Sequence, residues 1–357
     1  MDVEKSIPTS PPQYAPTETL SIRPLLLKPQ WMNGLSERLL ESHYENNYGG
    51  ALRRLNAIRA RLATLDWART PVFEINGLKR EELIAASSVI LHEIYFDSLG
   101  GHGDNPPSGT EEPTVGLAQA LERDFGSVKA WRAEFTSMAK ALAGGSGWVI
   151  LAWSERLGRL INQWAADHAH NLTAATPILA LDMYEHAYHL DFGAKASAYV
   201  DQVMANLNWE RITARYRLAI GEGVDEDKLF VPFGAPVQEG ARISAEELKV
   251  ALENADRRPL LLDLCLSRDV PRRTDMLAGA SMHAPSALSR WVEELPRGRP
   301  IVVYCICGFQ VSGRTVTELR QRGYNARALV GGITAWHAIG GATVPLDTST
   351  YEETLPS

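Results

Sequence analysis

The hydrophobic pattern changes its period along the chain, and this change limits the possible folds more than any other feature. Apolar residues recur at helical spacing through residues 34–62 and again through 80–99. Beyond residue 242, apolar runs of strand length at 259–266, 300–306 and 326–332 alternate with helical stretches. Such alternation is typical of a mostly parallel sheet with helices on both faces. The sequence therefore predicts two folding units of different class.

The region between these two patterns mixes helices and strands. Two helices are predicted across 115–142, and helical patterns resume at 185–205. Three short apolar runs between them predict strands, at 148–153, 159–164 and 177–184. We therefore expect the first unit to be a helical hairpin followed by an α+β part, and the second to be an α/β domain.

Composition shifts suggest where the domains begin and end. A stretch rich in Pro, Ser and Thr predicts a disordered tail at 1–18, and residues without a sustained period predict a linker at 213–241. Between and after them we expect domains at 19–212 and 242–345 and a C-terminal tail at 346–357.

Charge and hydropathy exclude two classes of partner. The 357 residues carry a formal net charge of −7, so the chain lacks the basic surplus that binding to nucleic acid requires. No stretch of about 20 uninterrupted apolar residues predicts a membrane span, and no secretory signal pattern is present at the start. We expect a soluble, cytoplasmic protein.

Histidine and cysteine are segregated along the chain. Seven of the nine histidines lie before residue 190, and all three cysteines lie after residue 260. An odd number of cysteines, two of them separated by a single residue, suggests reactive thiol rather than a disulfide scaffold. Two kinds of chemistry are therefore expected in two parts of the chain.

The early histidines predict a metal site. His43 and His92 each lie on a predicted helix, and His186 follows Asp182 by four residues at the end of a predicted strand. Three imidazoles and one carboxylate can hold a first-row transition metal and leave a position for solvent or substrate. A single histidine on an amphipathic helix is more often a packed residue, so Asp182 and His186 are the stronger evidence for a metal site.

The segment DMYEHAYH at 182–189 resembles the Asp-x-Trp-Glu-His-Ala-Tyr-Tyr signature of iron/manganese superoxide dismutases. The resemblance extends over about residues 20–215 and includes further segments at 39–56, 87–99, 125–135, 144–151 and 206–210. It implies that one iron or manganese ion per chain is bound by His43, His92, Asp182 and His186. It also implies that superoxide is converted into oxygen and hydrogen peroxide.

The resemblance assigns further residues around the metal. The residue that hydrogen-bonds metal-bound solvent is usually a glutamine, and we expect His168 in that role, with His170 as the alternative. Glu185 matches the glutamate that reaches a partner subunit's ligand histidine, which implies a homodimer. We also expect Tyr95 and Trp148 to support the ligands.

Three positions depart from the family pattern. The gateway tyrosine is Ala51, the histidine one turn after the first ligand is Asn47, and the tyrosine that ends the signature is His189. An alanine methyl group can neither donate a proton nor narrow a channel. We expect a working metal site with altered proton delivery and a wider mouth, in which Asn47 and a partner's His189 preserve part of the relay.

Cys305 ends an apolar strand-like run and precedes a glycine-containing loop and a helix. Backbone N–H groups of such a loop lower a thiol pKa and favour thiolate. The region 242–345 resembles the rhodanese family through ISAEEL, LLLDLCL, MLAGASMHAP, VVYCICG and LVGGITAWHAIGG. The resemblance implies that Cys305 carries a persulfide and exchanges sulfur with a donor and an acceptor.

This second region also departs from its family. Gln310 stands where many rhodaneses have an arginine, and the loop is compatible with either a six- or a seven-residue cradle. Cys307 offers a second thiol that could form a strained disulfide or resolve a persulfide, and Cys265 is expected to be a core residue. The alternative to a two-module enzyme is a weakened metal-binding redox or sensory protein whose rhodanese-like domain binds partners or oxyanions.

Overall fold

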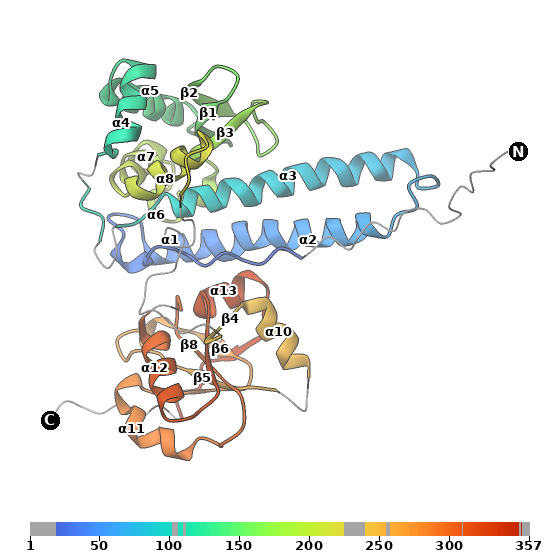
Figure 1. Ribbon diagram of the computed structural model, residues 1–357, viewed down its shortest axis with the longest axis vertical. Coiled ribbons are helices and arrows are strands. Elements are labelled where there is room, and N and C mark those ends of the chain that lie inside the picture. Colours follow the sequence, from blue (N-terminus) through green and yellow to red (C-terminus); the bar gives the residue numbers. More distant parts are fainter. Residues whose placement is uncertain are drawn as a thin grey trace, which may run out of the picture.

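The computed structural model describes residues 19–101, 106–109, 112–224, 240–254, 258–308, 310–349 and 351. The tail predicted at 1–18, residues 225–239 of the predicted linker and most of the predicted C-terminal tail lie outside the described residues. Figure 1 shows the helical hairpin lying between the α+β part and the C-terminal sheet domain. Within the described ranges, no helix has the length and apolar character needed to cross a lipid bilayer.

The hairpin is built from a short helix, a π-helical segment and two long helices. The helix α1 begins after Ser36, whose side chain accepts a hydrogen bond from the backbone N–H of Leu39. The π segment interrupts the regular helix predicted at 34–62, and π turns of this kind are frequent at functional sites. These elements are α1 (Glu37–Ser42), η2 (His43–Tyr48), α2 (Gly49–Ala63) and α3 (Val72–Asp97).

Gly49 marks a close approach between helices rather than a weak point in the hairpin. A Cβ atom on Gly49 would lie 2.4 Å from the carbonyl oxygen of Ala338 in the C-terminal helix α13 (Gly332–Ala338). A Cβ atom on Gly50 would meet nothing closer than 3.8 Å, at the side chain of Arg53. The helix continues through both glycines, and the first of them lets another domain approach.

The rest of the N-terminal domain packs a three-stranded antiparallel sheet, in the order β2-β1-β3, against helices. The pairing of Trp148 with Asp182 brings the start of β1 beside the end of β3. The helix α8 continues seven residues beyond residue 212, the predicted end of the domain, because Tyr216 is buried against the core. The elements are α4 (Val115–Phe125), α5 (Val128–Ala141), β1 (Trp148–Ser154), β2 (Arg159–Ala165), β3 (Ala175–Asp182), η3 (Glu185–Ala187), α6 (His189–Phe192), α7 (Ala196–Ala205) and α8 (Trp209–Ala219).

The C-terminal domain contains a five-stranded sheet in the order β4-β9-β8-β5-β7, with every neighbouring pair parallel. This confirms the predicted parallel sheet. A capping box between Ser244 and Glu247 begins α10. The principal elements are β4 (Arg242–Ile243), α10 (Ala245–Glu253), β5 (Leu260–Asp263), β6 (Asp275–Leu277), β7 (Ala280–Met282), α11 (Leu288–Trp291), β8 (Ile301–Tyr304), α12 (Gln310–Gln321), β9 (Ala326–Leu329), α13 and β10 (Thr343–Pro345).

Both faces of the parallel sheet are covered by helices. Val302 belongs to an apolar cluster with Ile333 of α13, and the next residue, Val303, belongs to a different cluster with Val316 of α12. Because side chains alternate between the faces of a strand, these neighbours serve opposite layers. The cluster around Val302 continues into the hairpin, so one face of the sheet faces the N-terminal domain.

Polar contacts also join the two domains. The imidazole of His337 contacts Glu45 of the hairpin at 2.8 Å through Nδ1 and Asp275 at 2.9 Å through Nε2. Arg272 pairs with Glu37 of α1. The C-terminal domain is therefore fixed against the hairpin by charged contacts as well as by packing.

Candidate metal centre and cysteine pocket

Four predicted ligands from four different elements meet inside the N-terminal domain. His43 begins η2, His92 lies in α3, Asp182 ends β3 and His186 lies in η3. The Oδ2 atom of Asp182 lies 3.1 Å from His43 Nε2, 3.2 Å from His186 Nε2 and 3.5 Å from His92 Nε2. All four candidate ligand atoms lie within 4.8 Å of one another. The fold therefore brings the predicted ligands to one point.

Burial fixes the charge of this cluster. Desolvation lowers the pKa of His43 and lowers that of His92 to about 3, so both imidazoles are neutral at neutral pH. Burial alone would raise the pKa of Asp182, but hydrogen bonds from His186 and His43 lower it below its usual value. The cluster combines neutral imidazole with an ionised carboxylate, as a metal site requires.

The hydrogen bonds of the ligands leave room for a cation. His92 Nδ1 donates to the backbone oxygen of Ser88 at 2.7 Å, which leaves a lone pair on Nε2. In the described part of the chain, no hydrogen-bond partner reaches the buried His92 Nε2. An unpaired acceptor in a buried cluster is costly unless something binds it, and nitrogen and oxygen ligands of this set suit iron or manganese.

His168, rather than His170, lies beside the cluster. The His168 ring centroid is 6.0 Å from that of His92, and its Nδ1 accepts a hydrogen bond from Trp148 Nε1 at 3.0 Å. Indole nitrogen can only donate, so the His168 hydrogen is on Nε2. His170 is exposed and stacks on Trp164 at the surface.

Residues 113–215 match the family described as iron/manganese superoxide dismutases, C-terminal domain. The iron superoxide dismutase of Cupriavidus metallidurans is 60% identical to this chain over 199 residues, which are 56% of this chain and 97% of that protein. The chain belongs to the iron/manganese superoxide dismutase family. We refer below to residues 19–224 as the dismutase domain.

More distant relatives span both metals. The iron superoxide dismutase of Aquifex pyrophilus is 34% identical over 200 residues, or 54% of this chain and 90% of that protein. The manganese superoxide dismutase 1 of Halobacterium salinarum is 32% identical over 190 residues, or 52% of this chain and 88% of that protein. The prediction that His43, His92, Asp182 and His186 form a site for iron or manganese is confirmed.

Tyrosines surround the ligands of the dismutase domain. Tyr95, a predicted supporting residue, lies with its ring centroid 5.0 Å from that of His43. Tyr199 donates a hydrogen bond to the backbone oxygen of Asp182 at 2.9 Å, and Tyr184 stacks on His168 at 4.8 Å. Neither Tyr199 nor Tyr184 was predicted. Tyr184 could have been found, since it replaces the tryptophan of the family signature, whereas Tyr199 lies on an amphipathic helix and gives no such signal.

The residues predicted to contact a second subunit lie at or near the surface. Glu185 and His189 are exposed, and Asn47 and Ala51 are half-buried. These positions are compatible with the predicted relay, whose cross-subunit contacts stay a prediction.

Cys305 directly follows β8 and precedes α12, as predicted from the sequence. Its thiol lies 3.6 Å from the Ser312 hydroxyl on α12. Gly308 has a φ of +72°, and a Cβ there would lie 2.6 Å from the backbone nitrogens of Gly331 and Gly332. The loop after Cys305 is therefore pressed against the start of α13, where only glycine fits.

The other two cysteines have different surroundings. Cys265 and Cys307 are buried, whereas Cys305 is partly exposed. Burial raises the pKa of Cys265 to about 11 and raises that of Cys307 well above its usual value. Cys265 is a core residue, as expected. Close to it in sequence, Arg273 pairs with the buried Asp263 at 2.7 Å. Cys305 is thus the most accessible of the three thiols.

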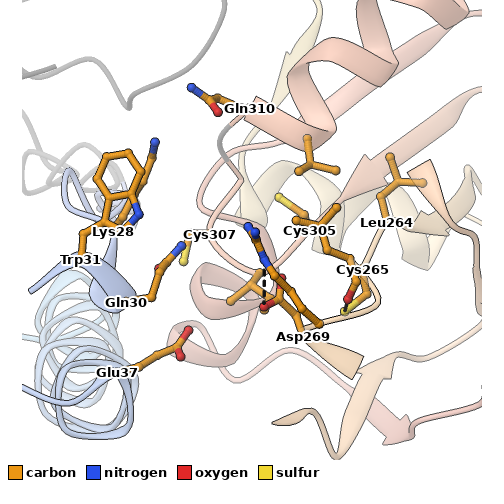
Figure 2. A pocket seen from close by; sticks show the side chains of 14 residues that line it. Lys28, Gln30, Trp31, Glu37, Leu264, Cys265, Asp269, Cys305, Cys307 and Gln310 are labelled. Atoms are coloured by element: carbon orange, nitrogen blue, oxygen red, sulfur yellow. Dashed lines mark hydrogen bonds and ion pairs between the residues drawn. The ribbon is translucent and has the colours of Figure 1, made fainter. Parts of the chain in front are cut away.

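A cavity of about 140 Å³ adjoins Cys305. Figure 2 shows that its walls come from both domains, with Lys28, Trp31 and Glu37 on one side and Cys305 and Cys265 on the other. Gln310 and Cys307 also line it. The resemblance to rhodaneses could not reveal this composition, because the dismutase-domain wall belongs to no rhodanese motif.

Proposed function

We propose that the dismutase domain catalyses the dismutation of superoxide. The observation that supports this best is the convergence of His43, His92, Asp182 and His186 in a chain of this family. Two superoxide ions and two protons give one oxygen molecule and one hydrogen peroxide molecule. When bound, iron or manganese supplies the one-electron couple that takes an electron from one superoxide ion and returns it to the next.

The side chains hold the metal and control protons. Neutral His43 and His92 and ionised Asp182 place nitrogen and oxygen ligand atoms close together in one buried cluster. Trp148 fixes the hydrogen of His168 on Nε2, so that this imidazole is a hydrogen-bond donor toward water or superoxide in the site. Burial lowers the pKa of His168 and favours this neutral donor.

The dimer is also part of the proposal. Glu185 and His189 are exposed on the chain close to the ligand His186, and a homodimer would cover them. In that arrangement Asn47 and the partner subunit's His189 exchange a hydrogen bond across the interface. Ala51 leaves the substrate entrance wider than a tyrosine would.

The direct test is metal content and superoxide turnover on one preparation, compared with His186→Ala. We expect both quantities to fall together in the variant, because one of four ligands is removed. A metal-loaded chain with no turnover above that of free metal would contradict the dismutase proposal and leave the metal site intact.

A second function is proposed for Cys305: it accepts a sulfur atom and passes it to a small acceptor. Supporting observations are the accessible thiol between β8 and α12 and the cavity beside it. The thiolate attacks the outer sulfur of thiosulfate, a new S–S bond forms as the old one breaks, and sulfite leaves with the bonding pair. Cyanide then removes the outer sulfur as thiocyanate and regenerates the thiolate.

This second function is tested by thiosulfate-to-cyanide sulfur transfer in the full chain. Cys305→Ser is expected to abolish it. Cys307→Ser tests separately whether the second, buried thiol of the cavity takes part. An unchanged rate in Cys305→Ser would reject Cys305 as the carrier.

The alternative function is a redox or sensory protein that binds metal with weak turnover and uses its C-terminal domain to bind partners or oxyanions. Ala51 at the entrance and Gln310 at the cavity favour it. A chain with bound metal, weak turnover and no sulfur transfer would support this alternative.

A further inference from the structure

The short helix α13 makes contacts at both of its ends, and the two ends serve different parts of the molecule. Its first turn lies against the loop that follows Cys305, and its last turn lies against the hairpin of the dismutase domain. Figure 1 shows α13 between this hairpin and the C-terminal sheet. The helix has seven residues and is therefore only about 10 Å long. A displacement at one end is thus carried to the other.

The start of α13 holds the backbone of the Cys305 loop. The N–H groups of Ile333 and Thr334 donate to the carbonyl oxygens of Cys305 and Ile306 at 3.0 and 3.2 Å, respectively. The Thr334 hydroxyl also donates to the Ile306 oxygen, at 3.1 Å. A Cβ atom on Gly332 would lie 2.2 Å from the Cys305 oxygen. Because the first N–H groups of a helix have no partner within it, these carbonyls complete α13, and the loop cannot shift without the helix.

The end of α13 is held by the hairpin. His337 contacts Glu45 of η2 at 2.8 Å through Nδ1 and Asp275 of its own domain at 2.9 Å through Nε2. An imidazole ring donates from both nitrogens when it is protonated, so it can bridge these two carboxylates. The next residue, Ala338, accepts a hydrogen bond from Arg53 of α2 at its carbonyl oxygen. The hairpin therefore fixes α13 through a side chain and through the backbone.

The loop that α13 holds lies between two cavities. Ile306, the residue after Cys305, lines the cavity of about 140 Å³ beside the thiol and a second cavity of about 330 Å³. Glu45 and His337 line the second cavity as well. The other charged residues of its lining are Glu37, Arg38, Glu41, Arg272, Arg273 and Asp275. Open space beside a loop leaves it few packing contacts there, so its position depends more on α13.

We propose that His337 is a positioning residue of the Cys305 site: its contact with Glu45 fixes α13 against the hairpin and thereby holds the loop that presents the thiol. Loss of this contact lets α13 shift, weakens the hydrogen bonds at its start and opens the loop more often. The proposal goes beyond sulfur transfer, because it concerns the order of the loop and applies to any reaction of the thiol. The dismutase domain thus controls the access of reagents to a cysteine in the other domain.

Two substitutions separate the two contacts of His337. An asparagine places its amide nitrogen near the position of Nδ1 and can keep the contact with Glu45. A glutamine reaches toward the position of Nε2 and can keep only the contact with Asp275. The alkylation rate of Cys305 by iodoacetamide is measured in the metal-loaded full chain at neutral pH by peptide mass spectrometry.

We expect the alkylation rate to rise about fivefold in His337→Gln, as when the free energy of one hydrogen bond no longer opposes opening. His337→Asn should change it little. An unchanged rate in His337→Gln, or an equal rise in the two variants, would overturn the proposal. Alkylation does not require sulfur transfer, so a chain without that activity tests the proposal equally. Bound metal per chain checks that the dismutase domain of each variant is folded.

Glu246→Ala is the matched control for a general loosening of the two domains. Glu246 of α10 accepts a hydrogen bond from the backbone N–H of Ile22 at 2.7 Å, which is a contact between the domains that does not involve α13. This variant should be less stable to urea and should keep the alkylation rate of Cys305. A rise as large as that of His337→Gln would assign the effect to loosened domains and overturn the role of His337.

Glu45→Ala tests the same contact from the side of the hairpin. It should raise the alkylation rate of Cys305 as much as His337→Gln does, and combining the two substitutions should add nothing, because both remove one interaction. Independent, multiplying effects of the two substitutions would contradict the proposed route through Glu45.

Discussion

The metal cluster and the cysteine pocket differ in how the fold encloses them. His43, His92 and Asp182 are fully buried within the dismutase domain, and all their ligand atoms meet inside one core. Cys305 is partly exposed, and its cavity has walls from both domains. The first site is thus complete in one domain, whereas the second depends on how two domains are held together. Changes inside the hairpin and changes at the domain boundary should therefore have separable effects.

The largest effect is expected from Asp182→Asn. The neutral amide lacks the negative charge that all three imidazoles face. Metal affinity and superoxide turnover should therefore each fall more than about 100-fold, which exceeds the loss usually caused by changing a residue that only hydrogen-bonds a ligand. Metal analysis and turnover on the same sample measure this, with the exposed Asp201→Asn as the control. Retained metal in Asp182→Asn would show that the cluster is not the binding site.

A smaller loss is expected from His168→Leu. Removing the Nε2–H donor held by Trp148 should lower turnover about 10- to 100-fold while metal remains bound. His170→Leu is the matched control, because that ring lies at the surface, and its turnover should be unchanged. Equal losses of turnover in the two variants would contradict the assignment of His168, rather than His170, to the metal site.

The domain boundary is probed by Gly49→Ala. The added Cβ would meet the Ala338 oxygen, and such overpacking costs about 1–3 kcal/mol. We expect lower stability to urea and faster alkylation of Cys305, with superoxide turnover per bound metal preserved. Gly50→Ala, which has open space, should instead be neutral or stabilising. If Gly49→Ala leaves Cys305 alkylation unchanged, the cavity does not depend on this contact.

The smallest effect concerns the pH dependence of the same boundary. Hydrogen bonds and charge from Glu45 and Asp275 outweigh burial and raise the pKa of His337; Glu41 also faces it. A histidine with a raised pKa in the folded state contributes stability that is complete below its unfolded value of about 6.5 and is lost as pH rises through the folded pKa.

We therefore expect His337→Gln to be destabilised by about 1 kcal/mol near pH 6 and by less near pH 8.5, as measured by urea unfolding. His283 should show the opposite pH dependence of stability. Burial lowers its pKa, so its contribution to the free energy of unfolding is lost as pH falls. If the loss of stability in His337→Gln does not change with pH, a charged His337 does not stabilise the contact between the domains.

The sequence predicted more of the metal site than of the cysteine pocket, for a physical reason. The ligands belong to local patterns: Asp182 and His186 share one short segment, and the helices that carry His43 and His92 have clear periodicity. The choice between His168 and His170 needed the structure, because a turn after β2 sends one inward and the other to solvent.

The domain boundary left almost no local signal. A glycine inside a helix lowers its stability, and the approach of α13 gives the structural reason for Gly49. Lys28 and Trp31 form part of a cavity whose cysteine lies in another domain, and no periodicity or motif connects such distant residues. Contacts between domains depend on tertiary packing, which local patterns do not encode.

The most direct test of the account is metal titration of the full chain. The protein is stripped with a chelator, iron or manganese is added back in steps, and bound metal and superoxide turnover are measured at each step. We predict that turnover rises in proportion to bound metal, reaches its limit at one ion per chain, and is unaffected by Cys305→Ser. Turnover in the metal-free chain, or full metal occupancy with no turnover above that of free metal, would contradict the account.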